Sequence, residues 1–167
     1  MRLRLLLLLL LLPAIQGCGY SAGYSGQALY RQDVSTVAVP IFANRSYYRG
    51  DEFRLSQAVA QALETKTPYK VADVAVADTV LEGEIVSIAL GNISRENRSS
   101  LPQEQVWLVS VNFTWKDQRT GEILVLRRNF EQSATFYPML GESTVIGSQL
   151  AAERLAEGIV QQLQTDF

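Results

Sequence analysis

Residues 104–116 read EQVWLVSVNFTWK, and this stretch decides the fold. Large apolar side chains occupy every second position, with Ser110, Asn112 and Thr114 between the later ones. Such alternation places the apolar set on one face of a β-strand and the polar set on the other. A strand with one buried face is typical of an antiparallel sheet that is covered on one side. The apolar set comprises Trp107, Val109, Val111, Phe113 and Trp115.

The segment that follows this strand predicts its first neighbour. Residues 117–121, DQRTG, have the length and composition of a hairpin turn. Residues 122–136 then return as the partner strand, and we expect Leu124, Leu126 and Phe130 to share a face.

The segment that precedes the central strand predicts its second neighbour. Residues 79–90 alternate as a long strand, with Leu81 and Ile85 on one face and Glu82 and Glu84 on the other. We expect residues 91–102, which join the two strands, to form a loop.

Two amphipathic helices are predicted at a greater distance along the chain. The first opens at Asp51 and ends before Pro68, and its apolar residues recur three and four positions apart. The second runs from about Ser143 to Leu163 with the same periodicity. The apolar stripes comprise Leu55, Ala58, Val59, Ala62 and Leu63 in the first helix, and Ile146, Leu150, Leu155, Ile159 and Leu163 in the second.

Two shorter strands complete the pattern. Residues 35–42 alternate as a strand in which Pro40 marks an edge position or the end, and residues 69–72 form a short apolar piece. The order predicts an α+β fold: a two-layer sandwich with two helices on one face of a mostly antiparallel or mixed sheet of four to five strands. The opposite sheet face is only half polar, which leaves room for a further partner there.

The first residues of the chain predict export. Arg2 and Arg4 precede an apolar run from Leu5 to Leu12, and Pro13 ends that run. This order is typical of a secretory signal. A transmembrane helix is the alternative, but it needs about 20 apolar residues, more than this run provides. We assign residues 1–17 to a signal peptide.

The cysteine that follows the signal predicts a lipid anchor. Residues 15–18, IQGC, resemble the lipobox of bacterial lipoproteins, in which Cys18 becomes the lipid-modified first residue. The alternative is an unmodified cysteine, and with one cysteine in the chain an internal disulfide is excluded. An aspartate directly after the cysteine retains such proteins at the inner membrane. Position 19 is glycine instead, which favours delivery to the outer membrane. Residues 18–33 are interpreted as lipidated N-terminus and tether, with Tyr30 able to pack on the domain instead, and residues 34–167 as one domain.

The composition argues against catalysis. The chain has no histidine, so serine–histidine and cysteine–histidine devices are absent, as are zinc sites built from His and Cys. Glu82 and Glu84 have a spacing that a glycosidase could use, but exposed strand carboxylates ordinarily serve solvation. We expect no enzyme, no cofactor and no metal. A net charge of −2 without a basic run argues against nucleic-acid binding.

The arginines supply the candidate ligand contacts. Arg95 and Arg98 lie in the predicted loop, whereas Lys116 and Arg119 flank the hairpin turn at the other end of the central strand. Guanidinium groups match phosphate geometry, so Arg95 and Arg98 are candidate contacts for an anionic glycolipid headgroup. The alternative for each is solvated loop charge.

Several segments together resemble the LptE family of lipopolysaccharide-assembly lipoproteins. The resemblance lies in Cys18-Gly-Tyr20, in residues 36–44 (TVAVPIFAN), in the helix that opens near Glu52 and in residues 77–85 (ADTVLEGEI). It extends in the same order over essentially the whole chain after the signal.

The resemblance implies a non-catalytic function at the Gram-negative outer membrane. It implies a palmitate-bearing lipoprotein at the periplasmic face, anchored through Cys18, that plugs and supports an LptD-like β-barrel. It also implies assistance in lipopolysaccharide delivery to the cell surface. We assign Arg95 and Arg98 to contacts with lipid A phosphates from their loop position and chemistry, not from a motif of the family.

Two alternatives remain at this point. The first strand and residues 77–85 also resemble periplasmic lipoproteins of the curli-secretion type and activators of peptidoglycan synthases. The curli-type proteins are generally longer and carry membrane-inserting hairpins for which this chain has no room. An exported hydrolase is the third hypothesis, and the lack of histidine argues against it.

Overall fold

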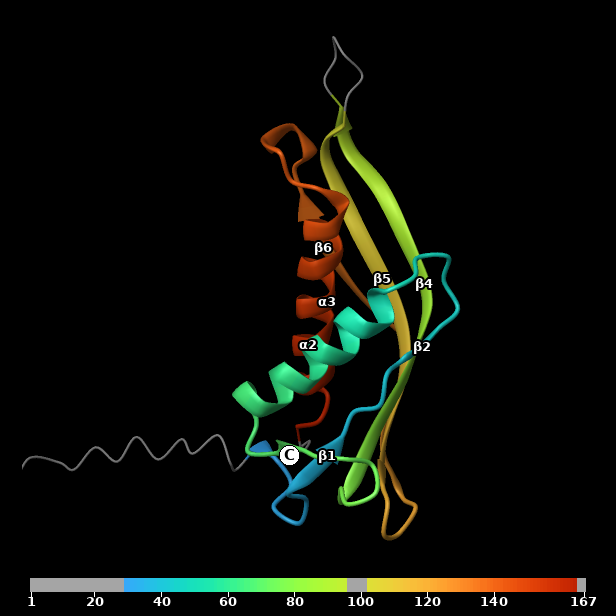
Figure 1. Ribbon diagram of the computed structural model, residues 1–167, viewed down its shortest axis with the longest axis vertical. Coiled ribbons are helices and arrows are strands. Elements are labelled where there is room, and N and C mark those ends of the chain that lie inside the picture. Colours follow the sequence, from blue (N-terminus) through green and yellow to red (C-terminus); the bar gives the residue numbers. More distant parts are fainter. Residues whose placement is uncertain (1–28, 96–101, 165–167) are drawn as a thin grey trace, which may run out of the picture.

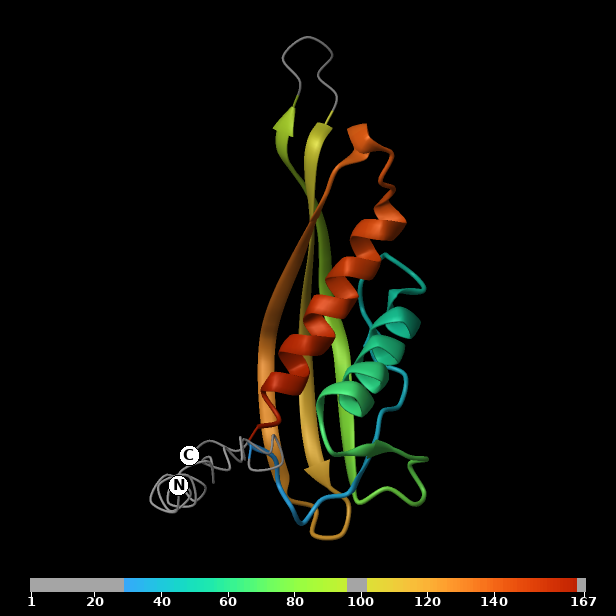
Figure 2. The ribbon, with the colours of Figure 1, turned by 90° about the vertical axis from the view of Figure 1, so that its left-hand side faces the viewer.

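The computed structural model describes residues 29–95 and 102–164. These residues form an open mixed sheet of six strands, and two helices, α2 (Asp51–Lys66) and α3 (Thr144–Gln161), lie together on one of its faces (Figure 1, Figure 2). The predicted α+β two-layer sandwich is confirmed, with one strand more than the four to five expected.

The sheet combines a parallel side with a long antiparallel meander. Strands β1 and β2 both pair with β4 in parallel, and β3 pairs in parallel with β1, whereas β4, β5 and β6 are antiparallel neighbours. The strands are β1 (Thr36–Ala38), β2 (Ala43–Asn44), β3 (Lys70–Val71), β4 (Thr79–Arg95), β5 (Pro102–Asp117) and β6 (Ile123–Phe136).

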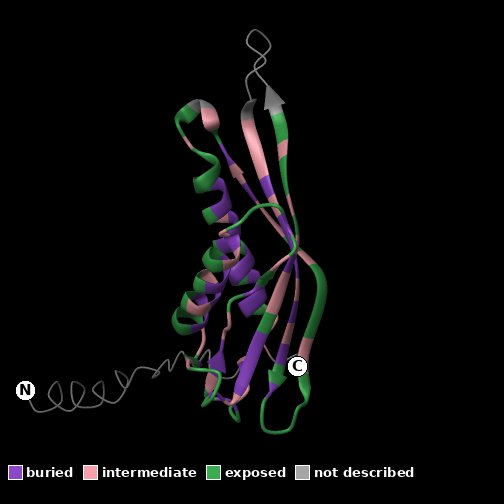
Figure 3. Cartoon of the chain, turned by 45° about the vertical axis from the view of Figure 1, so that its right-hand side comes forward, coloured by how far each residue is buried: buried purple, intermediate pink, exposed green. Residues whose placement is uncertain are grey.

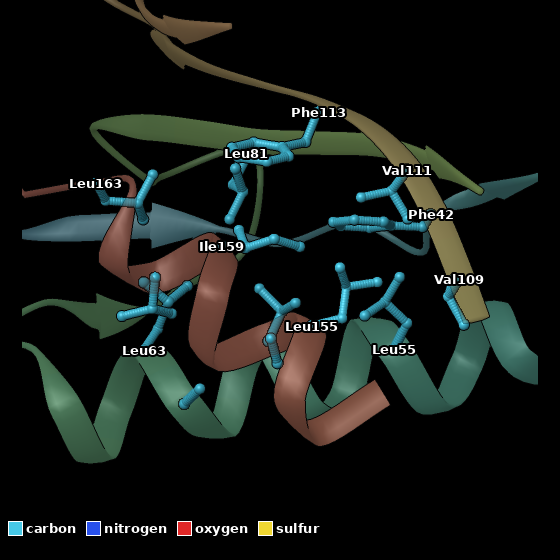
Figure 4. Close-up of a cluster of buried hydrophobic side chains, with 14 of the residues drawn as sticks. Phe42, Leu55, Leu63, Leu81, Val109, Val111, Phe113, Leu155, Ile159 and Leu163 are labelled. Carbon is cyan, nitrogen blue, oxygen red and sulfur yellow. The ribbon is translucent and has the colours of Figure 1, made fainter. Parts of the chain in front are cut away.

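Strand β5 organises the core, as its alternation predicts. The predicted apolar set is buried and faces the helices: Trp107, Val109, Val111, Phe113 and Trp115. Buried residues gather where the helices meet the sheet (Figure 3). The core joins sheet and helix side chains, among them Leu81, Val111, Phe113, Leu55, Leu63, Leu155 and Ile159 (Figure 4).

Residues 91–95 and residue 102 of the expected loop are strand, and residues 96–101 lie outside the described residues. Strand β4 continues to Arg95 and β5 resumes at Pro102, and these two residues pair with each other. Asn92 and Gln105 show why, because they also pair and the Gln105 amide donates to Asn92 Oδ1 at 2.7 Å. The polar side chains in this stretch are typical of a loop, but their backbones extend the pairing of β4 with β5.

The expectation that Leu126 shares a face with Phe130 is wrong. Leu126 pairs with Thr114 on the uncovered face and is 45% exposed, whereas Phe130 pairs with Val111 on the helix side. Between them, one extra residue of β6 stands opposite Asn112, whose Oδ1 accepts the backbone N–H of Asn129 at 2.9 Å. Such a bulge reverses the facing of every residue beyond it.

The strand expected at residues 35–42 is shorter than predicted. It is limited to β1, after which Pro40 interrupts the ladder, and β2 follows as a separate pair of residues. The Phe42 backbone N–H donates to Ser56 Oγ of α2 at 2.9 Å, which anchors this crossing segment to the helix.

The predicted turn at residues 117–121 is confirmed. Asp117 accepts the backbone N–H groups of Arg119 and Thr120, and Gly121 takes a φ of 77°. The two N–H donors and the Arg119 guanidinium lower the pKa of the Asp117 carboxyl to about 2. The turn is therefore fixed by its own side chains.

The described part of the expected tether packs on the domain. Tyr30 is 7% exposed, its ring lies 5.7 Å from that of Tyr69, and its hydroxyl donates to the Lys66 carbonyl at 3.3 Å. Residues 1–28, which include the predicted signal peptide, lie outside the described residues.

Candidate functional site

The sheet has one face that no described helix covers. Both helices pack on the face that carries Trp107 and Trp115, so residues 29–95 and 102–164 form no second layer on the opposite face of β4, β5 and β6 (Figure 2). The register places small and apolar side chains next to one another on its half nearer Arg95. We call this set the open face: Ala89, Gly91, Val106, Leu108, Ser110, Ser133 and Thr135.

The open face has the properties of a contact surface. None of its members is charged, although Glu131 pairs with Ser110 on the same face and borders the set. The methyl group of Ala89 and the lack of a side chain at Gly91 let another backbone approach closely. Leu108 and Val106 are half-buried at its centre. An uncharged centre with polar neighbours is typical of protein–protein contacts.

The acidic pair of β4 lies on the same side of the sheet, farther from Arg95. Glu82 pairs with Thr114 and Glu84 with Asn112, which confirms that the two carboxylates share a face. Glu84 forms an ion pair with Arg45 at 3.6 Å. This contact ties the segment after β2 to the sheet edge and gives Glu84 a structural role.

The hairpin of β4 and β5 carries the two arginines proposed from sequence. Arg95 is the last residue of β4, and Arg98 lies outside the described residues. Because β5 is 16 residues long, Arg95 lies roughly 50 Å from the turn that holds Arg119. This distance confirms the predicted separation of Arg95 from Arg119. Arg119 also forms an ion pair with Asp117 at 3.2 Å.

The chain enters the domain at the end of the sheet opposite Arg95 and Pro102. Arg119 donates to the Asp33 carbonyl at 3.3 Å, which places the entering segment beside the 117–121 turn (Figure 1). Cys18 lies outside the described residues, upstream of this segment. The domain therefore has an entry end and a hairpin end.

A pocket of about 340 Å³ lies where both helices begin, and we call it the helix-start pocket. The sheet contributes the side chains of Trp107 and Leu90, and the segment before α2 contributes two tyrosines and an arginine. Its lining comprises Tyr47, Tyr48, Arg49, Asp51, Arg54, Leu90, Trp107, Thr144, Val145 and Ser148.

The floor of this pocket holds a charged network. Arg54 Nη1 donates to Asp51 Oδ1 at 2.8 Å and to Ser148 Oγ at 2.9 Å, joining α2 to α3. Burial raises the pKa of the Asp51 carboxyl, and Arg54 partly offsets that effect. The sequence indicated Asp51 and Glu52 as a helix start, and the structure places them at the start of α2.

Sequence reasoning missed the helix-start pocket. Its residues come from four separate segments, and only the stretch from Tyr47 to Arg49 is locally conspicuous. Arg54 and Ser148 are 94 positions apart. No local pattern brings such residues together, so the packing of the two helices had to be known first.

Metal binding and membrane crossing are two further possibilities for the described residues. Within residues 29–95 and 102–164, no group of three or more His, Cys, Asp or Glu residues could hold a metal ion. Neither described helix combines the length and hydropathy needed to cross a membrane.

Solved structures with the same architecture are found at low identity. A hypothetical protein from Chlamydia trachomatis has a TM-score of 0.54 at 12% identity, covering 76% of this chain and 94% of that one. A variant of the PelC dodecamer from Paraburkholderia phytofirmans has 0.51 at 18%, covering 81% and 93%. The uncharacterized lipoprotein B from Nitrosomonas europaea has 0.50 at 11%, covering 82% and 85%. At these identities the likeness shows the fold alone.

Comparison with family models is more informative. None of the curated proteins compared matches the chain. The model of the LptE family, described as lipopolysaccharide-assembly, matches residues 34–167. That match spans the whole sandwich, from the segment before β1 to the end of the chain. The chain therefore belongs to the LptE family of lipopolysaccharide-assembly proteins, a non-enzymatic family of envelope lipoproteins.

Proposed function

We propose that this protein is an outer-membrane lipoprotein at the periplasmic face that acts as plug and partner of an LptD-like β-barrel. Anchored through Cys18, it assists lipopolysaccharide transport and assembly at the cell surface. The family match over residues 34–167 carries this proposal. The open face and the lipobox-like segment before Cys18 support it.

The open face is the part of the domain that meets the barrel in this proposal. The interior of a large membrane barrel is polar, and a plug must fit it without leaving unpaired charges buried. The open face meets that requirement with small, hydroxyl-bearing and short apolar side chains, and Glu131, which pairs with Ser110 at its border, would need a partner in the barrel.

Recovery of the barrel tests the proposal. The full chain, tagged and solubilised in detergent, should recover a large outer-membrane β-barrel from cell envelopes. Leu108→Arg, which adds a charge to the open face, should reduce that recovery about tenfold or more. Gln61→Arg, on the exposed side of α2, adds the same charge away from that face and should leave recovery unchanged.

Two results would contradict the proposal. Recovery of a peptidoglycan synthase in place of a barrel would favour the activator alternative. Normal surface delivery of lipopolysaccharide after depletion of the protein would separate it from that pathway.

We further propose that Arg95 and Arg98 contact lipid A phosphates at the hairpin end. Reversing both charges, Arg95→Glu with Arg98→Glu, should weaken lipopolysaccharide binding by about tenfold or more, and the loss should shrink as salt is raised. Lys70→Glu with Arg128→Glu changes net charge equally at exposed positions elsewhere and serves as control. Equal binding by the double variant and the wild type would remove these arginines from the site.

A further inference from the structure

Strand β4 has an unpaired edge along its half nearer Arg95 (Figure 1). On the side away from β5, strands β1 and β2 pair with β4 only as far as Ile85. The Arg45 backbone N–H donates to the Ile85 carbonyl at 3.0 Å, and the chain then leaves the sheet for α2. Residues 86–93 have no strand beside them on this side among the residues that the structure describes, and we call them the β4 edge.

The register of the sheet shows which backbone groups the β4 edge presents. Arg154 of α3 donates to the Ser133 carbonyl at 2.9 Å, so Ser133 of β6 turns its backbone away from β5. Its pairing partner Leu108 therefore turns its own N–H and C=O groups toward Ala89 of β4. Successive residues of a strand alternate in this respect, so Leu90 points its N–H and C=O groups away from β5, at the free side.

The β4 edge lacks the features that protect the opposite edge of the sheet. Strand β6 is interrupted by the bulge near Asn129, and Arg154 occupies one of its outward carbonyls. Its charged residues are Arg127, Arg128 and Glu131. Residues 86–93, VSIALGNI, contain neither a charged residue nor a proline. An uncharged, largely apolar edge with free backbone groups is a template for a further strand.

The helix-start pocket lies beside the β4 edge, on its helix side. Leu90 belongs to both, because its backbone faces the free side and its side chain lines the pocket with Tyr48 and Val145. Leu90 is 39% exposed and Val145 is 52% exposed, so apolar surface is open there. In strand addition, main-chain hydrogen bonds supply affinity and pockets for alternate side chains supply specificity. The β4 edge offers both.

The charges of the pocket favour an incoming segment that carries an acidic residue. Arg54 forms an ion pair with Asp51 at 2.8 Å. Arg49 is exposed and donates to the Asn44 carbonyl at 3.2 Å, but it forms no ion pair with a carboxylate among residues 29–95 and 102–164. A carboxylate on the added strand would supply that partner, because a guanidinium pairs well with carboxylate geometry.

We propose that the β4 edge accepts an extended segment of the partner barrel as a further strand of the sheet. The segment bonds the outward backbone groups of Ile88 and Leu90, places an apolar side chain in the helix-start pocket and brings a carboxylate to Arg49. It occupies the position in the sheet that β2 leaves. The open face includes Ala89 of the same strand, so one partner covers both surfaces. The assignment of this segment to a barrel rests on the proposed function.

Hydrogen exchange of the backbone amides tests the added strand directly. The tagged full chain is exchanged alone in detergent and in the barrel complex recovered from cell envelopes, and mass spectrometry reads the exchange residue by residue. We expect the Ile88 and Leu90 amides to exchange at least about tenfold more slowly in the complex. The Ala89 amide faces β5 and should exchange slowly in both states. Unchanged exchange at Ile88 and Leu90 in a complex that contains the barrel would overturn the proposal and leave the proposed function standing.

Proline variants test the same edge through recovery of the barrel. Leu90→Pro removes an outward N–H and no bond to β5, so the domain should fold, as circular dichroism can check, while recovery falls about tenfold. Leu90→Ala keeps the N–H and should recover more barrel than Leu90→Pro. Leu126→Pro makes the same change at an outward position of β6 and should leave recovery unchanged. Equal recovery by Leu90→Pro and Leu126→Pro would contradict strand addition at β4.

Charge and stoichiometry identify the occupant. Arg49→Glu should reduce barrel recovery about tenfold, and the loss should shrink as salt is raised. Lys70→Glu makes the same charge change at an exposed position of β3 and should have no effect, so equal recovery by both would refute the carboxylate contact. A dimer of the full chain in detergent that Leu90→Pro dissociates would assign the edge to a second copy and overturn the proposal. Absence of any barrel from the recovered proteins would overturn the proposed function, and this proposal with it.

Discussion

Trp115→Ala should lower the free energy of unfolding by about 4 kcal/mol, the largest effect we expect from one core substitution. Trp115 is 1% exposed, and its ring centroid lies 5.7 Å from that of Tyr69. Removing the indole leaves a cavity in the centre of the core and takes the Nε1 donor away from Thr79. The free energy lost with the buried indole and the cost of the cavity add. The loss of the hydrogen bond to Thr79 lowers stability further.

Urea unfolding of the full chain in detergent, followed by circular dichroism, measures this effect. Trp115→Phe keeps an aromatic ring in place and should cost about 1–2 kcal/mol. Leu126→Ala serves as surface control, because Leu126 is 45% exposed, and should cost less than about 1 kcal/mol. A Trp115→Ala loss no larger than that of Leu126→Ala would show that Trp115 does not organise the core.

Gly83→Ala should lower the free energy of unfolding by about 3 kcal/mol, although alanine adds only a methyl group. A Cβ at Gly83 would lie 2.2 Å from Phe42 Cε2 and 2.5 Å from Cδ2. Phe42 is 2% exposed, and its backbone is fixed by the hydrogen bond to Ser56. The ring cannot move away, so β4 must shift from its neighbours.

A second glycine of the same strand provides a matched control. A Cβ at Gly91 would meet only Val106 Cγ1, at 3.1 Å, and a valine methyl can move by a few tenths of an ångström. Gly91→Ala should therefore change stability by less than about 1 kcal/mol, since it also reduces the freedom of the unfolded chain. Thermal melting of the two variants side by side checks this. Equal melting temperatures would mean that Phe42 does not require a glycine beneath its ring.

Sequence periodicity predicted the parts of the fold that depend on local pattern. The facing of Trp107 to Trp115 follows from alternation alone, and the start of α2 at Asp51 follows from its apolar period. Leu126 was misplaced because a bulge depends on how two strands pair, which one strand does not reveal. The ladder near Asn92 was missed for the same reason, because its polar residues gain their order from β5.

The candidate sites also differ in whether local sequence or tertiary packing reveals them. Cys18 is marked by its immediate neighbours, and Arg95 and Arg98 by their place between two strands, so sequence could nominate all three. The helix-start pocket depends on the parallel packing of α2 on α3, which places Arg54 beside Ser148. Nothing in either segment alone indicates that contact.

The parallel placement of β1 sets an order for folding. Strands β4 to β6 join through short sequence separations, whereas β1 must pair with β3 and β4 across more than thirty residues that include all of α2. Closing long loops is slower than closing short ones, so we expect the meander to form early and β1 to dock late. The segment that carries Tyr30 and leads back to Cys18 precedes β1 in the chain. The end of the domain at which the chain enters would then be the last to acquire its native contacts.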